Sequence, residues 1–154
     1  MRVLIVEDDD NKRLQVTQAV RQILPRAELI QEKSLQSGLR SARQQAPTLV
    51  LLDMTLPNYD AGPDESGGQT HIFGGREFLR QMDRFELSMP VIVITQFETF
   101  GKGADAIELS DLDKQLREEH SQLYIGAVYY HAAIAGWEDA LRDLIFSALP
   151  QEGS

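Results

Sequence analysis

The chain has 154 residues, of which 42% are hydrophobic and 25% are charged, and this composition suits a single domain with a packed core. Its net charge of -9 would repel the phosphate backbone of nucleic acid, so direct nucleic-acid binding is not expected. The absence of cysteine excludes disulfides, thiolate metal sites and cysteine catalysis. No apolar run reaches membrane-spanning length, so we expect a cytoplasmic protein with no membrane partner.

Short apolar segments alternate with helical patterns along the chain. In chain order, these patterns predict a strand at 3–6, a helix at 11–24, a strand at 27–31, a helix at 34–45, a strand at 48–52, a helix at 75–84, a strand at 90–95, a helix at 110–120, a strand at 123–129 and a helix at 136–149. Strands that are apolar on both faces and separated by helices are typical of a parallel sheet covered on both sides. We therefore expect an α/β fold: a flavodoxin-like (βα)5 doubly wound parallel sheet with strand order 2-1-3-4-5.

Polar residues mark several of the predicted helix starts. Asp9 and Asp10 are expected to cap and open the first helix, whose apolar side should include Leu14. Ser34 is a candidate N-cap for the second helix, and Ser110 begins a capping-box pattern at the fourth. These features place the helices between the strands without deciding which side of each helix faces the core.

Two segments are longer than the connections of a compact domain usually are. They cover 54–74 and 96–109, and loops of this length tend to be functional or mobile. The first has the glycines and polar residues of a solvated lid, although a tolerated surface insertion explains it equally well. We expect one domain over 1–150 and a short tail over 151–154.

Carboxylates follow two of the predicted strands. Glu7 and Asp8 come directly after the first strand, and Asp53 comes directly after the third. With the expected strand order these two strands are neighbours, and ligands of such sheets bind beyond the carboxyl ends of the strands. Three close carboxylates need either a raised pKa or a bound cation, and oxygen ligands favour Mg²⁺. A carboxylate beside Mg²⁺ can also attack phosphorus and form an aspartyl phosphate.

The segments VLIVEDD, LVLLDMTLP and PVIVIT, in this order, resemble the receiver domain of two-component response regulators. The resemblance runs from residue 2 to about residue 149 and is weaker after Thr95. It implies that Asp53 is the phosphoacceptor and that Thr95 is the switch hydroxyl. It further implies a Mg²⁺ ion bound by Asp8, Asp53 and the backbone carbonyl of Thr55, with Glu7 binding through water.

The pattern departs from this family at the end of the fifth strand. Receiver domains usually carry a lysine there, and this chain has Tyr130 instead. Ala127 or Val128 stands where the family has an aromatic switch residue. None of the four lysines is near this strand end in the sequence, and Lys102, in the segment after the fourth strand, is one candidate substitute.

The resemblance implies a stand-alone, atypical receiver that acts as a Mg²⁺-dependent phospho-aspartate switch. Its expected partners are a histidine kinase or phosphotransfer protein and a downstream signalling protein. The surface around the fourth helix, fifth strand and fifth helix would bind the downstream protein, or a second copy in a homodimer. Self-phosphorylation and dephosphorylation at Asp53 would be its only chemistry.

Two alternatives stay open at this stage. The missing lysine and the two long segments also suit a pseudo-receiver, a protein-interaction adaptor that works without phosphorylation. A Mg²⁺-dependent phosphotransferase or phosphatase ranks lower. The motif DMT at residues 53–55 lacks the second aspartate that an aspartyl phosphatase would use as its acid and base.

Overall fold

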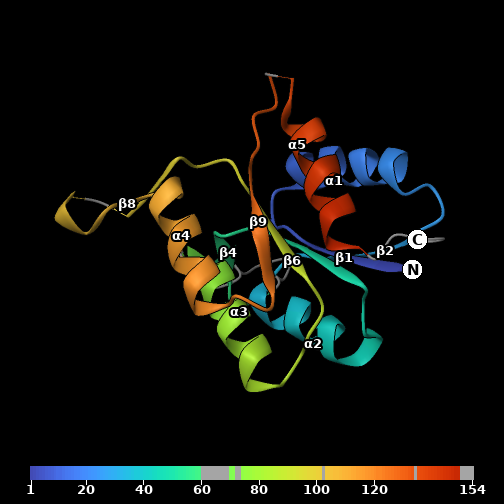
Figure 1. The fold of residues 1–154 in the computed structure, drawn as a ribbon, viewed down its shortest axis with the longest axis horizontal. Helices are drawn as coiled ribbons and strands as arrows, with labels where there is room; N and C mark the ends of the chain where they lie inside the picture. The colour runs from blue at the N-terminus through green and yellow to red at the C-terminus, as the bar shows by residue number, and fades with distance from the viewer. Residues whose placement is uncertain (60–69, 72–73, 102, 134, 150–154) are drawn as a thin grey trace, which may run out of the picture.

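The computed structural model describes residues 1–59, 70–71, 74–101, 103–133 and 135–149. Its centre is a five-stranded parallel sheet (Figure 1) with the order β2-β1-β3-β6-β9. The strands are β1 (Arg2–Val6), β2 (Glu28–Glu32), β3 (Leu49–Leu52), β6 (Val91–Thr95) and β9 (Tyr124–Tyr129). Because β6 and β9 are the fourth and fifth strands of this sheet, the predicted flavodoxin-like order 2-1-3-4-5 is confirmed.

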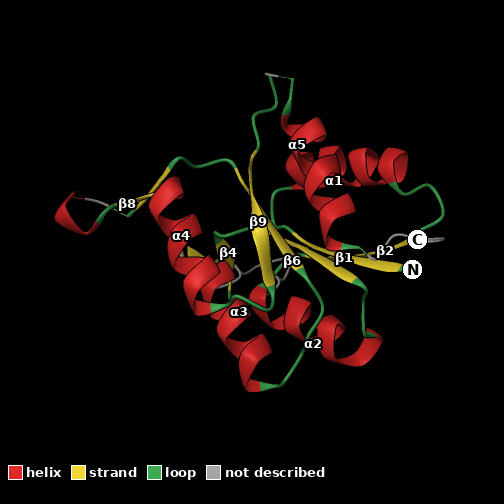
Figure 2. Cartoon of the chain, in the orientation of Figure 1, coloured by secondary structure: helices red, strands yellow, loops and turns green. Residues whose placement is uncertain are grey.

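Helices cover both faces of the sheet (Figure 2). One face carries α1 and α5, and the other carries α2, α3 and α4. Their bounds are α1 (Asp10–Ile23), α2 (Leu35–Gln45), α3 (Gly74–Arg84), α4 (Leu109–Glu119) and α5 (Trp137–Ala148). Two apolar layers result, one on each side of central strands whose side chains are almost completely buried. Burying both faces of these strands is what makes their sequences continuously apolar.

Two of the predicted helix caps are present. The Asp9 side chain accepts a hydrogen bond from the backbone N–H of Lys12 at 2.8 Å, so Asp9 caps α1. Ser34 caps α2, and its hydroxyl and that of Ser37 form a reciprocal capping box. Both caps were readable from the sequence because they depend on short-range spacing alone.

Two predictions about the helices are wrong. Leu14 is 51% exposed, because α1 turns its other side toward the sheet and buries Lys12 and Val16. Ser110 does not cap α4, which begins one residue earlier with Glu108 at the N-cap and no side-chain cap hydrogen bond. The α4 start is set instead by a backbone hydrogen bond from Leu109 N–H to the Glu98 carbonyl.

The long segments contain small hairpins. In the first, β4 (Leu56–Pro57) pairs antiparallel with β5 (Thr70–His71). In the second, β7 (Thr99–Phe100) pairs with β8 (Ile107–Glu108), and this hairpin extends away from the sheet beside α4 (Figure 1). The predicted lid lies largely at 60–69 and 72–73, and the predicted tail at 151–154; both fall outside the described residues.

No helix in the described ranges is both long and apolar enough to cross a membrane.

Candidate functional site

The acidic residues predicted to converge do lie together at the carboxyl edge of the sheet. Val6 and Leu52 are register partners on the parallel strands β1 and β3, so Glu7 and Asp53, the next residue of each strand, leave the sheet side by side. The backbone N–H of Asp53 donates to the Val6 carbonyl at 3.0 Å and continues the pairing. Carboxylate oxygens of Glu7, Asp8 and Asp53 all lie within 4.8 Å of one another.

The three carboxylates differ in their access to water. Glu7 is 3% exposed and Asp53 is 6% exposed, whereas Asp8 is exposed. Burial, followed by repulsion from Asp53, raises the pKa of Glu7 to about 9. Burial also raises the pKa of Asp53, against the opposing effect of Lys12. Without a metal, this pair therefore holds a proton at neutral pH, and the opening toward solvent lies at Asp8.

A buried lysine completes the site, and the sequence did not predict it. Lys12, in the first turn of α1, is 2% exposed. Its Nζ lies 2.6 Å from Glu7 Oε1 and 3.1 Å from Asp53 Oδ1, and it donates a 2.7 Å hydrogen bond to the Ile94 carbonyl. Burial would lower the pKa of Lys12, but the Asp53 and Glu7 carboxylates raise it above its ordinary value. The lysine is therefore charged.

No lysine is close to the end of the fifth strand in the sequence, as predicted. In the structure, however, Lys12 does lie close to it. Lys12 Nζ is 6.0 Å from the centre of the Tyr130 ring, immediately after β9. A signal for it did exist: Lys12 shares one helical face with Val16, Ala19 and Val20, all of them buried. Lys102, the substitute considered from the sequence, lies outside the described residues.

Tyr130 fills the place predicted for the missing lysine. It is 4% exposed, and its ring packs edge-on against Trp137 with the centroids 4.9 Å apart. Its backbone N–H donates to the Thr95 carbonyl at 2.8 Å, which holds it at the end of the sheet. The Tyr130 hydroxyl is buried and finds no hydrogen-bond partner among the described residues.

The remaining predicted residues lie around the same edge. Thr95 ends β6, is fully buried, and accepts a hydrogen bond from the Phe97 N–H at 3.2 Å, which leaves its own hydroxyl hydrogen available. Its register partner on β9 is Tyr129, so an aromatic residue does lie beside Thr95. The sequence had placed the aromatic switch position at Ala127 or Val128, neither of which is aromatic. Thr55 lies two residues beyond Asp53 and is half-buried. The metal-binding role of its carbonyl stays a prediction.

The donor set suits a small, hard divalent cation. All three side chains offer oxygen, one of them faces solvent, and the fully ionised site has two more carboxylates than ammonium groups. Mg²⁺ prefers such oxygen ligands and keeps several waters, which an opening at Asp8 would accommodate. Burial is the main reason that the pKa of both buried carboxyls is raised, and a cation bound beside them would favour their ionised forms. The residues therefore fit Mg²⁺.

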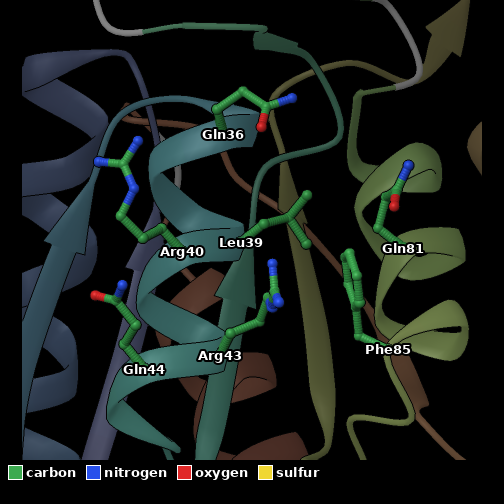
Figure 3. Close-up of a pocket in the computed structure, with 7 residues that line it drawn as sticks. All are labelled: Gln36, Leu39, Arg40, Arg43, Gln44, Gln81 and Phe85. Atoms are coloured by element: carbon green, nitrogen blue, oxygen red, sulfur yellow. The ribbon is translucent and has the colours of Figure 1, made fainter.

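A larger hollow elsewhere lacks these features. A groove of about 560 Å³ lies between α2 and α3 (Figure 3). Its walls are exposed side chains such as Arg40 and Gln44, and the Arg43 guanidinium lies 4.1 Å from the centre of the Phe85 ring. It contains neither a carboxylate nor a nucleophile, so the chemistry of this chain is concentrated at the carboxyl edge of the sheet.

Comparison by sequence finds relatives of nearly the same length. No protein-family model matches the chain. It is 38% identical over 146 residues to the uncharacterized protein y4jR of Sinorhizobium fredii, a match that covers 93% of this chain and 95% of y4jR. It is 24% identical over 143 residues to the Detocs response regulatory protein DtcB of Enterobacter cloacae, covering 92% of this chain and 95% of DtcB.

Comparison by structure finds the same architecture in signal receivers. A response regulator receiver domain protein from Clostridium thermocellum matches with a TM-score of 0.57 at 18% identity, covering 96% of this chain and 92% of that one. The signal receiver domain of a modulated diguanylate cyclase from Desulfovibrio desulfuricans matches with a TM-score of 0.60 at 18% identity, covering 96% and 91%. At these identities the structures establish the shared fold.

Proposed function

We propose that this chain, which has the fold of signal receiver domains and resembles a response regulatory protein, is a stand-alone response-regulator receiver, a switch phosphorylated at Asp53. The observation that carries the proposal is the meeting of Glu7, Asp8 and Asp53 with the Lys12 ammonium at one edge of the sheet. Relatives matched over 95% of their length, one of them named a response regulatory protein, support a receiver that works without a fused output domain.

The proposed reaction is transfer of a phosphoryl group to the Asp53 carboxylate. An Asp53 oxygen attacks phosphorus and forms an O–P bond, while the bond from phosphorus to the donor breaks. A histidine kinase or phosphotransfer protein would donate from phosphohistidine, whose ring nitrogen leaves with the bonding electrons and takes up a proton. The partly buried edge limits water around the acceptor, which strengthens its electrostatic interactions.

Magnesium would be bound by Asp8 and Asp53, with the Thr55 carbonyl as a further ligand and Glu7 acting through water. When bound, it neutralises phosphoryl oxygens and orients the in-line displacement. Asp8, the exposed member of the set, is the carboxylate that the ion would meet first. Glu7 and Asp53 would release the proton that their raised pKa values retain in the metal-free protein.

Thr95 would link the phosphoryl group to the outer surface. Its hydroxyl hydrogen is available, and its neighbour across the sheet is Tyr129, which lines a groove of about 510 Å³ beside α4. Glu98 and Glu108 line the same groove. A downstream protein bearing basic side chains would suit this surface, and phosphorylation would shift the population of two arrangements there.

We expect the protein to gain the mass of one phosphoryl group when it is incubated with acetyl phosphate and Mg²⁺. Asp53→Asn should abolish the adduct, because an amide oxygen is far less nucleophilic than a carboxylate. Intact-mass spectrometry measures both results. Asp111→Asn, an exposed aspartate on α4, is the matched control and should be phosphorylated like the wild type.

Absence of the adduct in the wild type, together with absence of any Mg²⁺-dependent change in Trp137 fluorescence, would contradict the proposal. Multiple turnover of a phosphoester would instead indicate an enzyme. An adduct that persists in Asp53→Asn would place the acceptor elsewhere on the chain.

One observation favours a second candidate, an adaptor that works without phosphorylation. The Lys12 ammonium pairs with Asp53 and Glu7, so the chain itself supplies a positive charge beside the two buried carboxylates. In that case the surface formed by α4, β9 and α5 would bind its partner in a single state. Partner binding that is identical for wild type and Asp53→Asn would support this candidate.

A further inference from the structure

We propose that Lys12, on the first turn of α1, is the residue that binds the phosphoryl group at Asp53, replacing the lysine that usually ends the fifth strand of a receiver. The inference rests on the proposed phosphorylation of Asp53 and assigns the cation that this site otherwise lacks.

The first support is the direction of all three Lys12 contacts. An ammonium group has three hydrogens, and here they face Glu7, Asp53 and the Ile94 carbonyl. These partners follow β1, follow β3 and belong to β6, so the charge lies across the ends of three adjacent strands. A 2% exposed lysine is rare in proteins unless it is paired, and this one is paired with the proposed acceptor itself.

The second support is that an aromatic residue occupies the position where receiver domains usually carry their lysine. Tyr130, directly after β9, is packed between the Lys12 ammonium and the Trp137 ring. An aromatic ring there leaves no cationic side chain on the fifth strand to reach the acceptor. Within the described ranges, Lys12 is the only lysine or arginine that pairs with Asp53.

The third support is the way Lys12 is anchored. Its backbone N–H is held by the Asp9 cap at 2.8 Å, so the start of its side chain is fixed. The four-carbon chain beyond it can still move the ammonium by a small rotation. When Asp53 becomes an ester, its negative charge moves outward onto the phosphoryl oxygens. Lys12 can then keep the Ile94 carbonyl and exchange its Asp53 contact for a charge-assisted hydrogen bond to phosphoryl oxygen.

The test uses trifluoroberyllate, a phosphoryl analogue, and Mg²⁺ as separate probes of the whole 154-residue chain. Trp137, the single tryptophan, reports on the pocket because its ring touches Tyr130. Lys12→Met keeps the length of the side chain and removes its charge. We expect Mg²⁺ to bind Lys12→Met more tightly, because a competing cation is gone, and trifluoroberyllate at saturating Mg²⁺ to bind at least about tenfold more weakly.

This opposite change separates the proposal from a merely structural role, which would weaken both ligands or neither. Lys114→Met, at an exposed lysine on α4, is the matched control and should leave both affinities unchanged. The double variant Lys12→Met with Tyr130→Lys returns an ammonium to the fifth strand and should recover trifluoroberyllate binding. Far-UV circular dichroism checks each fold, and Lys12→Gln replaces Lys12→Met if the latter does not fold.

Equal trifluoroberyllate affinity in wild type and folded Lys12 variants would overturn the assignment of Lys12 and leave phosphorylation of Asp53 standing. A wild type that binds no trifluoroberyllate and forms no phosphoryl adduct would overturn both proposals together.

Discussion

Glu7→Gln is expected to stabilise the metal-free protein, with a gain in the free energy of unfolding that grows as pH rises. The wild-type Glu7 carboxyl is buried, and its pKa is raised from 4.5 to about 9. The folded protein therefore retains a proton that the unfolded chain has already lost, and this difference lowers stability progressively as pH rises between these two values. Glutamine is uncharged at every pH and removes this penalty.

We expect the two proteins to be similar near pH 4.5, the ordinary pKa of this group. Near pH 8 we expect the variant to be more stable by about 2 kcal/mol, a value reduced from the full shift because glutamine has one acceptor oxygen for the two contacts that Glu7 makes, with Asp9 N–H at 3.1 Å and with Lys12 Nζ at 2.6 Å. Urea unfolding with a chelator present, repeated across this pH range, measures the difference.

Glu118→Gln provides the control for this prediction, since Glu118 is exposed on α4 and should change stability little at any pH. A Glu7→Gln protein that is less stable than wild type near pH 8 would show that the ion pair with Lys12 outweighs the crowding of the carboxylates. Whichever protein is more stable without metal, magnesium should stabilise wild type more than the variant, because Glu7→Gln removes one carboxylate from the site.

Gly75→Val is expected to lower the free energy of unfolding by about 3 kcal/mol and to reduce phosphorylation of Asp53. Gly75 is the second residue of α3 and lies directly against the segment that follows β3, and its N–H donates to the Met54 carbonyl at 2.8 Å. A β-carbon at Gly75 would lie 2.9 Å from the Asp53 carbonyl oxygen and 2.9 Å from Met54 Cα. Because both are backbone atoms, the backbone at Asp53 and Met54 must shift.

Gly75→Ala adds only the β-carbon and therefore tests the backbone contact without the rest of the valine side chain. Helix propensity alone would make alanine more stable than glycine by about 1 kcal/mol, whereas the backbone contact predicts a net loss. Arg80→Val places the same β-branched side chain at an exposed position of α3 and should cost no more than about 1 kcal/mol. Chemical denaturation and the acetyl phosphate mass assay together report on both consequences. A Gly75→Ala protein at least as stable as wild type would contradict the prediction.

Much of the architecture was predictable because it depends on short-range patterns. Continuous apolar strands separated by amphipathic helices indicate a doubly wound parallel sheet, and the sheet has the expected order. Parallel strands point their carboxyl ends toward one edge, so residues that follow two neighbouring strands must meet. This rule predicts that Glu7, Asp8 and Asp53 lie together, as they do in the structure. The caps at Asp9 and Ser34 were also predictable, because each depends on residues only three positions apart.

The cation of the site was not predictable in this way. Lys12 and Leu14 are two positions apart, so they lie on nearly opposite sides of α1. Leu14 was the expected core residue because it is apolar, yet the helix buries Lys12, because two buried carboxylates and the Ile94 carbonyl satisfy its ammonium. That pairing depends on strands brought together from three parts of the chain.

The sequence by itself therefore determined the sheet, the edge at which the carboxylates meet and the acidic half of the candidate site, because each follows from the direction of strands and the spacing of residues along them. Only the tertiary structure decided that the opposing charge comes from α1 and that Tyr130 closes the fifth-strand position. The rotation of a helix about its axis and the partner of a buried charge are set by contacts between segments far apart in sequence.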